Sequence, residues 1–333
     1  MALMKIAVIG PDVAELADLR AAGAEVVTGS GRSADDVIEA CRGADIVMCF
    51  GLSTFDERVF ANLPRLKFLQ QCTVGYDWVD VAAATRHGVV VANSPFFCLE
   101  EVSDHAAMLI LACARKLGEH LRVYRQHGWD RQKTIDAVAP IHRIRGRKLG
   151  FVAFGKIARL TAEKLSGFGM TYLAYDPYLT QDQVDAWKVK LVSLEELCQR
   201  SDFVSMHALL NDGTRKIFGE AQFRAMKPGA YFVNTSRGGT VDEIALARAL
   251  TEKWIAGAAL DVLTQEPPEV GNPVVEAANL ILLPHTAGYS VEAMADNRRQ
   301  TVDQVLRVLK GEWPTVCVNP EVRASARLSP TRV

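Results

Sequence analysis

The chain has 333 residues, 49% of them hydrophobic, which is enough apolar material for a large core and more chain than one compact layer structure uses. Two domains are therefore expected. The 38 Lys and Arg residues are balanced by 39 Asp and Glu residues, and the net charge of −1 excludes a global electrostatic footprint for nucleic acid or anionic lipid, so any basic site must be local.

The cysteine pattern and the hydropathy indicate the redox compartment and whether a metal site or a membrane span is expected. The seven cysteines form no C-x-x-C pair and no Cys/His group at ligand spacing, which predicts buried thiols in a reducing cytoplasm and no metal site. The longest near-continuous apolar run, 106–114, is far shorter than the ~20 residues that a bilayer needs, so no membrane association is expected. Segment 1–10 carries Lys5 inside its apolar stretch and resembles a strand more than a signal peptide.

The first hundred residues alternate short β-branched runs with helical patterns, which predicts a parallel sheet with helices on both faces. The turn after the first strand has Gly10 but no second glycine, so no nucleotide is placed there. The expected strands are 5–9, 25–28, 45–49, 67–69 and 89–92, and the expected helices are 13–22, 33–41, 56–61 and 78–86.

Three further segments precede the central motif. Loop 73–77 follows a predicted strand, where open α/β sheets bind ligands, although a plain strand-to-helix turn containing Gly75 is the favoured local interpretation. Segment 100–127 has the pattern of one long helix that crosses between domains. The basic run 141–148 is expected to be a solvated connection, with the alternative that one arginine steers cofactor phosphates.

Residues 149–176 have the pattern of a strand, a glycine turn, a helix ending at Gly169, and a second strand that ends in a carboxylate. Gly155 would let a pyrophosphate approach the first turn of the helix. Asp176 lies 21 positions further on, where it can accept hydrogen bonds from both ribose hydroxyls and repel the 2′-phosphate of NADP. Ala153 replaces the first glycine of the G-x-G-x-x-G pattern, so the turn either keeps a negative φ or is strained by ~1 kcal/mol. An ordinary βαβ crossover is the alternative interpretation.

After Asp176 the alternation resumes, and we expect six strands from 149 to 283 to complete one doubly wound sheet. A final helix is predicted at 291–310, followed by a polar, disordered tail at 321–333. The later strands are expected at 189–192, 202–207, 230–234, 257–261 and 280–283, with helices at 193–200, 220–226 and 242–252.

Arg237, Glu266 and His285 stand at or beyond the ends of late strands, and strand carboxyl ends converge on one crevice in this architecture. Arginine offers two parallel donors to a carboxylate. Histidine can exchange the proton that accompanies hydride transfer at an alcohol carbon, and a neighbouring carboxylate would orient its ring and favour the protonated acid. Taken singly, each residue also has an ordinary interpretation as part of a surface loop or turn.

Segments 234–243, 258–262, 266–268 and 283–286 resemble the D-isomer-specific 2-hydroxyacid dehydrogenases, and the resemblance extends over 67–319. Segments 95–105 and 174–178 are further similar to the branch that includes the C-terminal binding proteins and phosphoglycerate dehydrogenase-like enzymes. The resemblance implies an α/β fold of two doubly wound parallel-sheet domains. An NAD-binding Rossmann domain, 100–288, would be inserted into a discontinuous flavodoxin-like substrate domain, 1–99 plus 289–333.

The resemblance also implies roles. Arg237 would bind the substrate carboxylate and carbonyl oxygen, His285 would be the general acid/base paired with Glu266, and the backbone amides of Val74 and Gly75 would hold the carboxylate. The implied NAD contacts are Phe154, Gly155, Lys156 and Ile157 at the pyrophosphate, Asp176 and Pro177 near the ribose, Asp261 at the nicotinamide carboxamide, and His207, Thr214, Thr235 and Ser236 elsewhere.

The expected function is interconversion of a D-2-hydroxyacid and its 2-oxoacid by hydride transfer, in a cytoplasmic homodimer. The alternatives are an NAD(H)-sensing interaction protein with little catalysis and a non-redox Rossmann module. Three residues depart from the family pattern: Ala153; Leu209, where proline is usual; and Gly288, where the named branch tends to have tryptophan. The first two would loosen the cofactor site. A glycine at 288 suggests a roomier pocket, so the substrate cannot be transferred from the family.

Overall fold

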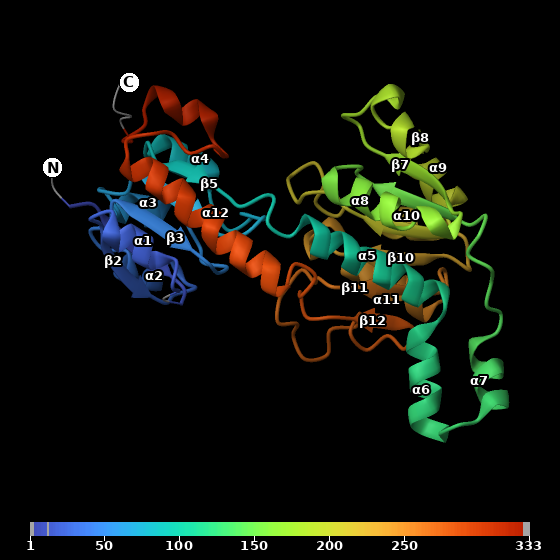
Figure 1. The fold of residues 1–333 in the computed structure, drawn as a ribbon. Coiled ribbons are helices and arrows are strands. Elements are labelled where there is room, and N and C mark those ends of the chain that lie inside the picture. The colour runs from blue at the N-terminus through green and yellow to red at the C-terminus, as the bar shows by residue number, and fades with distance from the viewer. Residues whose placement is uncertain (1–2, 12, 329–333) are drawn as a thin grey trace. The chain divides into compact units, whose positions relative to one another are not determined.

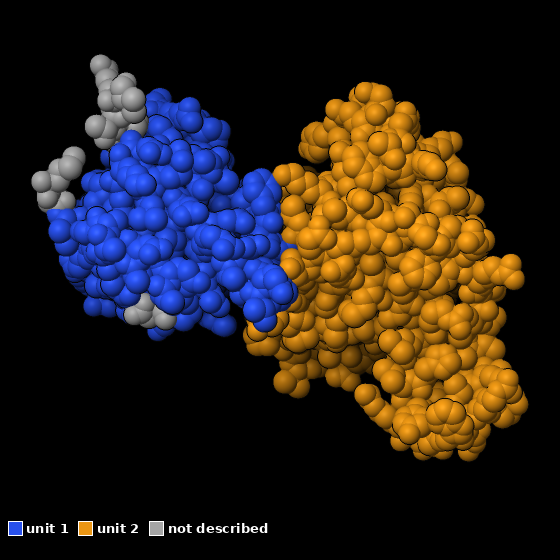
Figure 2. Space-filling model, viewed as in Figure 1, with its two compact units in different colours: residues 1–98, 290–333 blue, residues 99–289 orange. Residues whose placement is uncertain are grey.

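The computed structural model describes residues 3–11 and 13–328, and its chain divides into two compact units (Figure 2). Unit 1 comprises residues 1–98 and 290–333, and unit 2 comprises residues 99–289. Each unit contains one parallel sheet covered by helices, so the predicted class of two parallel-sheet α/β domains is confirmed (Figure 1). Within the described ranges, no helix has both the length and the apolar character needed to cross a membrane.

Unit 1 is built on five parallel strands in the order β2-β1-β3-β4-β5, the flavodoxin-like order. The strands are β1 (Lys5–Ile9), β2 (Glu25–Gly29), β3 (Ile46–Cys49), β4 (Phe68–Gln71) and β5 (Val90–Ala92). The helices are α1 (Leu16–Ala21), α2 (Ala34–Ala40), α3 (Glu57–Asn62), α4 (Val81–Arg86) and α12 (Val291–Leu309), and a 3₁₀ helix covers Pro320–Ala324.

The two faces of this sheet carry separate cores because successive strand residues point to opposite sides. Ile6 and Val8 of β1 pack in one cluster with α1 and α12, whereas Ala7 and Ile9 pack in the other with α2, α3 and α4. Helix α12 supplies Val302, Val305 and Val308, all nearly fully buried, so the end of the chain completes the core that its beginning starts. Alternate residues of β1 therefore belong to different cores, one on each face of the sheet.

The expected disorder at 321–333 is wrong for residues 321–328. Val322 is fully buried and Leu328 is 4% exposed in the same cluster as β1 and α12. The backbone N–H of Arg327 donates to the carbonyl of Gly88, which ties this segment to the turn before β5. Residues 329–333 lie outside the described residues.

Unit 2 has seven parallel strands in the order β12-β11-β10-β9-β6-β7-β8. A strand lies at each of the seven places that the sequence indicates, so only the expected total of six is wrong. The chain runs outward through β6, β7 and β8 and then returns to place β9 beside β6, which creates the switch point at which doubly wound sheets bind ligands. The strands are β6 (Lys148–Val152), β7 (Thr171–Tyr175), β8 (Val189–Leu191), β9 (Phe203–Met206), β10 (Tyr231–Asn234), β11 (Gly257–Leu260) and β12 (Leu280–Leu282).

Helices cover both faces of the second sheet. Helices α5 (Leu99–Ala114) and α8 (Lys156–Lys164) pack with Leu149 and Phe151 of β6 on one face. Helices α9 (Leu194–Arg200), α10 (Glu220–Ala225) and α11 (Glu243–Thr251) pack with Val152 and Val204 on the other. A 3₁₀ turn follows α8 and ends at Gly169, whose φ of +67° confirms the predicted stop.

The predicted single helix over 100–127 is wrong. Lys116 adopts a left-handed φ of +52° and separates α5 from α6 (Leu117–His127). Helix α7 (Arg131–Val138), which the sequence did not indicate, packs against α6, and the pair extends away from the sheet of unit 2 (Figure 1). In the basic run that follows, His142, Arg143 and Arg145 are exposed as expected, whereas Arg147 lies 3.2 Å from the carboxylate of Asp202.

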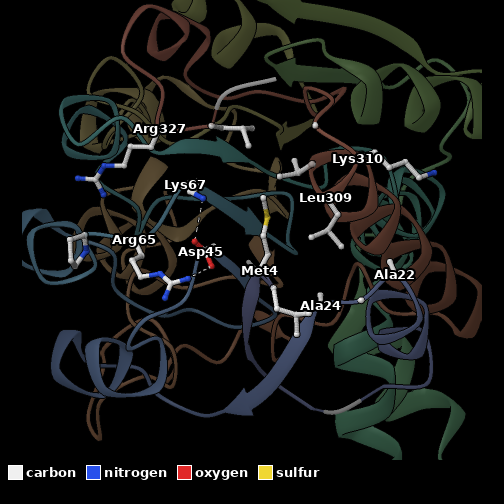
Figure 3. A pocket seen from close by; sticks show the side chains of 15 residues that line it. Met4, Ala22, Ala24, Asp45, Arg65, Lys67, Leu309, Lys310 and Arg327 are labelled. Carbon is white, nitrogen blue, oxygen red and sulfur yellow. Dashed lines mark hydrogen bonds and ion pairs between the residues drawn. The ribbon is translucent and has the colours of Figure 1, made fainter. Parts of the chain in front are cut away.

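Each sheet has an aspartate at the amino ends of its central strands, buried in unit 1 and half-buried in unit 2. Asp45 accepts the N–H of Lys5 and forms ion pairs with Arg65 at 2.8 Å and Lys67 at 3.3 Å. Asp45 lies on the wall of a pocket of about 1150 Å³, which Lys310 and Arg327 also line (Figure 3). This edge is opposite to the carboxyl ends at which open α/β sheets bind ligands, so the pocket is not the expected active site.

Asp202 has the same position in unit 2. Its carboxylate accepts the N–H of Lys148 at 2.8 Å and lies 2.9 Å from Lys227 Nζ and 3.2 Å from Arg147 Nη1. Burial opposes ionisation, but these hydrogen bonds and charges prevail and lower the pKa of Asp202. The ionised carboxylate therefore stabilises the start of β6.

We predict that Asp202→Asn lowers the free energy of unfolding at pH 7 by about 1–3 kcal/mol, because the Lys148 N–H and two cations lose their charged partner. A carboxyl whose folded pKa is depressed stabilises the fold above its unfolded pKa of ~3.9 and loses that contribution as pH falls through the folded pKa. The difference from wild type should thus narrow below pH ~4. Urea unfolding followed by circular dichroism across this range measures it. The exposed Asp212→Asn is the control, and an equal loss in both variants would contradict the prediction.

Candidate active site

Arg237, Glu266 and His285 follow β10, β11 and β12, which are neighbours in the second sheet. Because these strands are parallel, the loops after them leave from the same edge. His285 Nδ1 lies 2.6 Å from Glu266 Oε2, and the positive charge of Arg237 acts on the Glu266 carboxylate. The structure therefore brings the three residues into one electrostatic group.

Glu266 is held in place from two sides. Its Oε1 accepts the backbone N–H of Leu263 at 2.9 Å, while its Oε2 faces the His285 ring. Partial burial opposes ionisation, but the hydrogen bonds from His285 and Leu263 and the charges of His285 and Arg237 prevail and lower the pKa of Glu266. An ionised Glu266 makes His285 Nδ1 the donor, and it leaves Nε2 to exchange a proton with a ligand.

The backbone of His285 is in the left-handed region, with φ +54°. Such a conformation costs a non-glycine residue roughly 1–3 kcal/mol and persists only where its surroundings impose it. Here Asp261 imposes it: the Asp261 carbonyl accepts the His285 N–H at 2.8 Å, and its carboxylate accepts the N–H groups of Thr286 at 3.0 Å and Ala287 at 2.9 Å. Asp261 itself is buried. The role predicted for it at the nicotinamide stays a prediction.

The Arg237 loop reaches the Glu266 loop because residue 238 is glycine. A Cβ on Gly238 would lie 2.0 Å from the carbonyl carbon of Leu263, so no other residue fits without moving one of the loops. Asn234 shapes the same loop by accepting the N–H of Ser236 and donating to the carbonyl of Arg237. Arg237 itself is half-buried and donates to the carbonyl of Ser236 at 2.8 Å.

The turn between β6 and α8 adopts the strained alternative for Ala153, whose φ is +66°. Its N–H donates to Tyr175, and the next N–H, of Phe154, donates to Asp176 Oδ2 at 3.0 Å. Gly155 is the N-cap of α8 and provides no side-chain cap, and a Cβ built on it would meet no atom within 4 Å. Open space at an uncapped helix N-terminus is what a docked pyrophosphate requires, so the turn fits NAD.

Other predicted cofactor residues surround the switch point. Asp176 and Pro177 follow β7, and Asp176 Oδ1 accepts the N–H of Tyr178 at 3.0 Å. Thr235, which follows β10, has a buried Oγ1 without a hydrogen-bond partner among the described residues. Buried polar atoms are normally paired, so this hydroxyl fits a ligand contact. Phe154 is fully buried, so only its backbone can face a cofactor. Lys156 and Ile157 form the first turn of α8, and Ser236 precedes Arg237.

His207 and Thr214 lie in the segment after β9. The N–H of His207 donates to the Val152 carbonyl, its Nε2 lies 2.8 Å from Ser205 Oγ, and burial lowers the pKa of the ring to about 3, so His207 is neutral. Thr214 donates its hydroxyl to the carbonyl of Leu209, the position at which the family usually has proline. The Leu209 side chain itself is 70% exposed.

Val74 and Gly75 belong to unit 1 and follow β4. Their carbonyls are occupied, by Asn93 Nδ2 at 2.7 Å and by Thr73 Oγ1 at 2.7 Å respectively. Their two N–H groups donate to nothing within the described ranges, which leaves them available to an anionic ligand.

Pattern analysis missed one residue that contacts this group. His105 of α5 lies with its Nε2 3.5 Å from Asp261 Oδ1, and its side chain is 15% exposed. Its signal in the sequence is only that of a polar residue close to the apolar stripe of a helix. The described residues contain no group of three or more His, Cys, Asp or Glu side chains that could hold a metal ion.

A doubly wound sheet with an uncapped helix at its glycine turn and a His–Glu contact at its carboxyl edge is typical of NAD-binding dehydrogenases. Residues 107–287 match the model of the NAD-binding domain of D-isomer specific 2-hydroxyacid dehydrogenases. The chain belongs to this family, and NAD is its cofactor.

Relatives agree with this assignment. The chain is 37% identical to a glyoxylate reductase of Korarchaeum cryptofilum over 86% of either chain. It is 33% identical to the D-3-phosphoglycerate dehydrogenase of Methanocaldococcus jannaschii over 89% of this chain but only 55% of that one. A solved glyoxylate reductase from Paecilomyes thermophila superimposes with a TM-score of 0.86 at 26% identity, covering 96% of this chain and 99% of that one. An NADPH-dependent glyoxylate/hydroxypyruvate reductase from Sinorhizobium meliloti, solved with NADP and malonate, gives 0.85 at 26% identity with full coverage of both.

We predict that Gly155→Ala weakens NADH binding about tenfold or more while the free energy of unfolding stays within ~0.5 kcal/mol of wild type. The added methyl group meets no protein atom, so only a ligand on the first turn of α8 would clash with it. NADH fluorescence titration and urea unfolding measure the two quantities. Gly167→Ala, which also has open space, is the matched control. Unchanged NADH affinity in Gly155→Ala would show that the cofactor does not bind at this turn.

Proposed function

We propose that the protein interconverts a 2-oxoacid and the D-2-hydroxyacid with NAD(H), using Arg237, Glu266 and His285. The observation that carries this proposal is the 2.6 Å contact between His285 Nδ1 and an ionised Glu266. The positive charge of Arg237 also helps to lower the pKa of Glu266. An acid/base pair of this kind is required for proton transfer at an alcohol or carbonyl oxygen, and a protein that only senses NAD(H) has no use for it.

The chemistry divides among few groups. Bound NADH supplies the hydride that reduces the carbonyl carbon. His285 Nε2 gives its proton to the carbonyl oxygen in reduction and takes it back from the hydroxyl in oxidation. Glu266 keeps the ring oriented and stabilises the imidazolium, while the guanidinium of Arg237 binds the substrate carboxylate and polarises the carbonyl.

A substrate-binding role is also proposed for two residues of unit 1. The unoccupied N–H groups of Val74 and Gly75 would hold the substrate carboxylate, which makes unit 1 the substrate domain. Residues 100–288 would form the NAD domain, with Phe154 to Ile157 at the pyrophosphate and Asp261 near the nicotinamide. His207, Thr214, Thr235 and Ser236 would make the remaining cofactor contacts.

Asp176 supports a preference for NADH over NADPH. Its carboxylate stands at the end of β7, and the next cation along the chain is Lys188. A 2′-phosphate there would meet a negative charge with no nearby sequence partner. Gly288 supports a roomier substrate pocket than a tryptophan would leave.

The test is an NADH- and NADPH-oxidation assay against glyoxylate, hydroxypyruvate, pyruvate, phosphohydroxypyruvate and bulkier 2-oxoacids. We expect turnover of at least one of them, with kcat/KM at least about tenfold higher for NADH than for NADPH. Higher kcat/KM for bulky than for small 2-oxoacids would support the pocket inferred from Gly288. A blank across the panel would contradict the proposed function and favour an NAD(H)-sensing interaction protein.

We also propose a cytoplasmic homodimer. None of the seven cysteines, all of them described residues, forms a disulfide bond, which agrees with a reducing compartment. Leu117, Leu121 and Tyr124 lie on one face of α6 at helical spacing and are 45–57% exposed, and Trp129 beyond them is 94% exposed. An apolar stripe of this kind on the projecting α6–α7 pair suits a second copy of the chain.

We predict that Leu121→Asp combined with Tyr124→Asp converts the dimer into a monomer, because two carboxylates would be desolvated in the proposed contact. Light scattering after size exclusion should give 36.5 kDa for the variant and twice that mass for wild type. Ile244→Asp, at an apolar position of α11 that is 60% exposed, should remain dimeric. A monomeric wild type, or a dimeric double variant, would refute the assignment.

A further inference from the structure

The contact between His105 and Asp261 lies behind the proposed acid/base pair. The Asp261 side chain is fully buried, and His105 Nε2 lies 3.5 Å from its Oδ1. The two residues come from different elements of unit 2, since His105 is on α5 and Asp261 directly follows β11. The 3.5 Å separation is within ion-pair distance for a protonated ring, and His105 Nε2 has no hydrogen-bond partner in the described part of the chain.

Asp261 connects this contact to His285. Three successive backbone N–H groups, of His285, Thr286 and Ala287, donate to Asp261, the first to its carbonyl and the others to its carboxylate. The carboxylate thereby fixes the segment that holds His285 at φ +54°. A shift of the Asp261 carboxylate would move the His285 ring relative to Glu266.

A buried carboxylate is costly unless it is paired. Two neutral N–H donors compensate part of that cost, and His105 supplies the nearby positive or donor group. Among the described residues, His105 makes no hydrogen bond or ion pair with Glu266, Arg237 or the His285 ring, so its effect on the reaction must pass through Asp261.

We propose that His105 is a positioning residue for the reaction, holding Asp261 and through it the His285 loop in the geometry for proton transfer. This inference rests on the proposed function of His285. Because His105 is proposed to act on the geometry of the His285 loop and does not itself touch the ligand, its loss should slow the chemical step much more than it weakens binding.

The test compares His105→Leu, which removes the donor, with His105→Gln, whose amide nitrogen can replace Nε2. We expect His105→Leu to lower kcat about 10–100-fold with KM and the NADH dissociation constant within ~3-fold of wild type. The kinetic isotope effect with 4-deuterated NADH should rise as hydride transfer becomes rate-limiting. His105→Gln should recover kcat to within ~5-fold of wild type. His142→Leu, at an exposed histidine of the same unit, is the control and should leave all values unchanged.

Wild-type kcat and isotope effect in His105→Leu would overturn the inference, as would equal loss in the Leu and Gln variants. If His105→Leu does not fold, His105→Ala assayed with added imidazole replaces it, and kcat that imidazole does not raise would overturn the inference. Absence of any turnover by the wild-type protein would instead overturn the proposed function, so the two failures are distinguishable.

Discussion

The site depends on one constraint: three neighbouring parallel strands end at the same edge of a sheet. That constraint gathers the loops after β10, β11 and β12, although their functional residues lie far apart in the chain. Two local features complete the arrangement. Gly238 lets the Arg237 loop touch the backbone of Leu263, and Asp261 binds three backbone N–H groups of the loop that follows β12. Without either feature the sheet would remain, but Arg237, Glu266 and His285 would no longer be held close together.

The two edges of the second sheet have different physical characters. At the amino ends, Asp202 is paired with two cations and a backbone donor, an arrangement that stabilises the folded state. At the carboxyl ends, Ala153 and His285 both adopt left-handed backbone conformations that L residues avoid. Strain of this kind collects at ligand-binding and catalytic positions, where surrounding hydrogen bonds over-determine the backbone. The two edges of the sheet in unit 1 differ in a similar way. Asp45 is paired with cations at the amino edge, and the N–H groups of Val74 and Gly75 are unoccupied beyond the carboxyl end of β4.

The sequence was a good guide where local pattern decides the structure. Alternating apolar runs and helical periods placed most strands within a residue or two, and the spacing from Gly155 to Asp176 marked the turn before α8 and the end of β7. Lys116 shows where pattern fails: lysine is an ordinary helix former, and nothing in its neighbours indicates a left-handed residue that splits one helix into two. Val322 and Leu328 looked like isolated apolar residues in a polar tail, and their burial depends on packing with α12 and with β5, which is far away in the chain.

The candidate site shows the same limit. That Arg237, Glu266 and His285 lie at one edge follows from strand order, but the 2.6 Å pairing of His285 with Glu266 and the His105–Asp261 contact depend on tertiary packing. The role proposed for His285 is proton transfer and not cofactor binding. Its most direct test measures kcat and the NADH dissociation constant of His285→Ala beside wild type. We expect kcat to fall by about 10²–10⁴-fold with NADH affinity within ~3-fold of wild type. Loss of NADH binding together with substantial residual turnover would contradict the account.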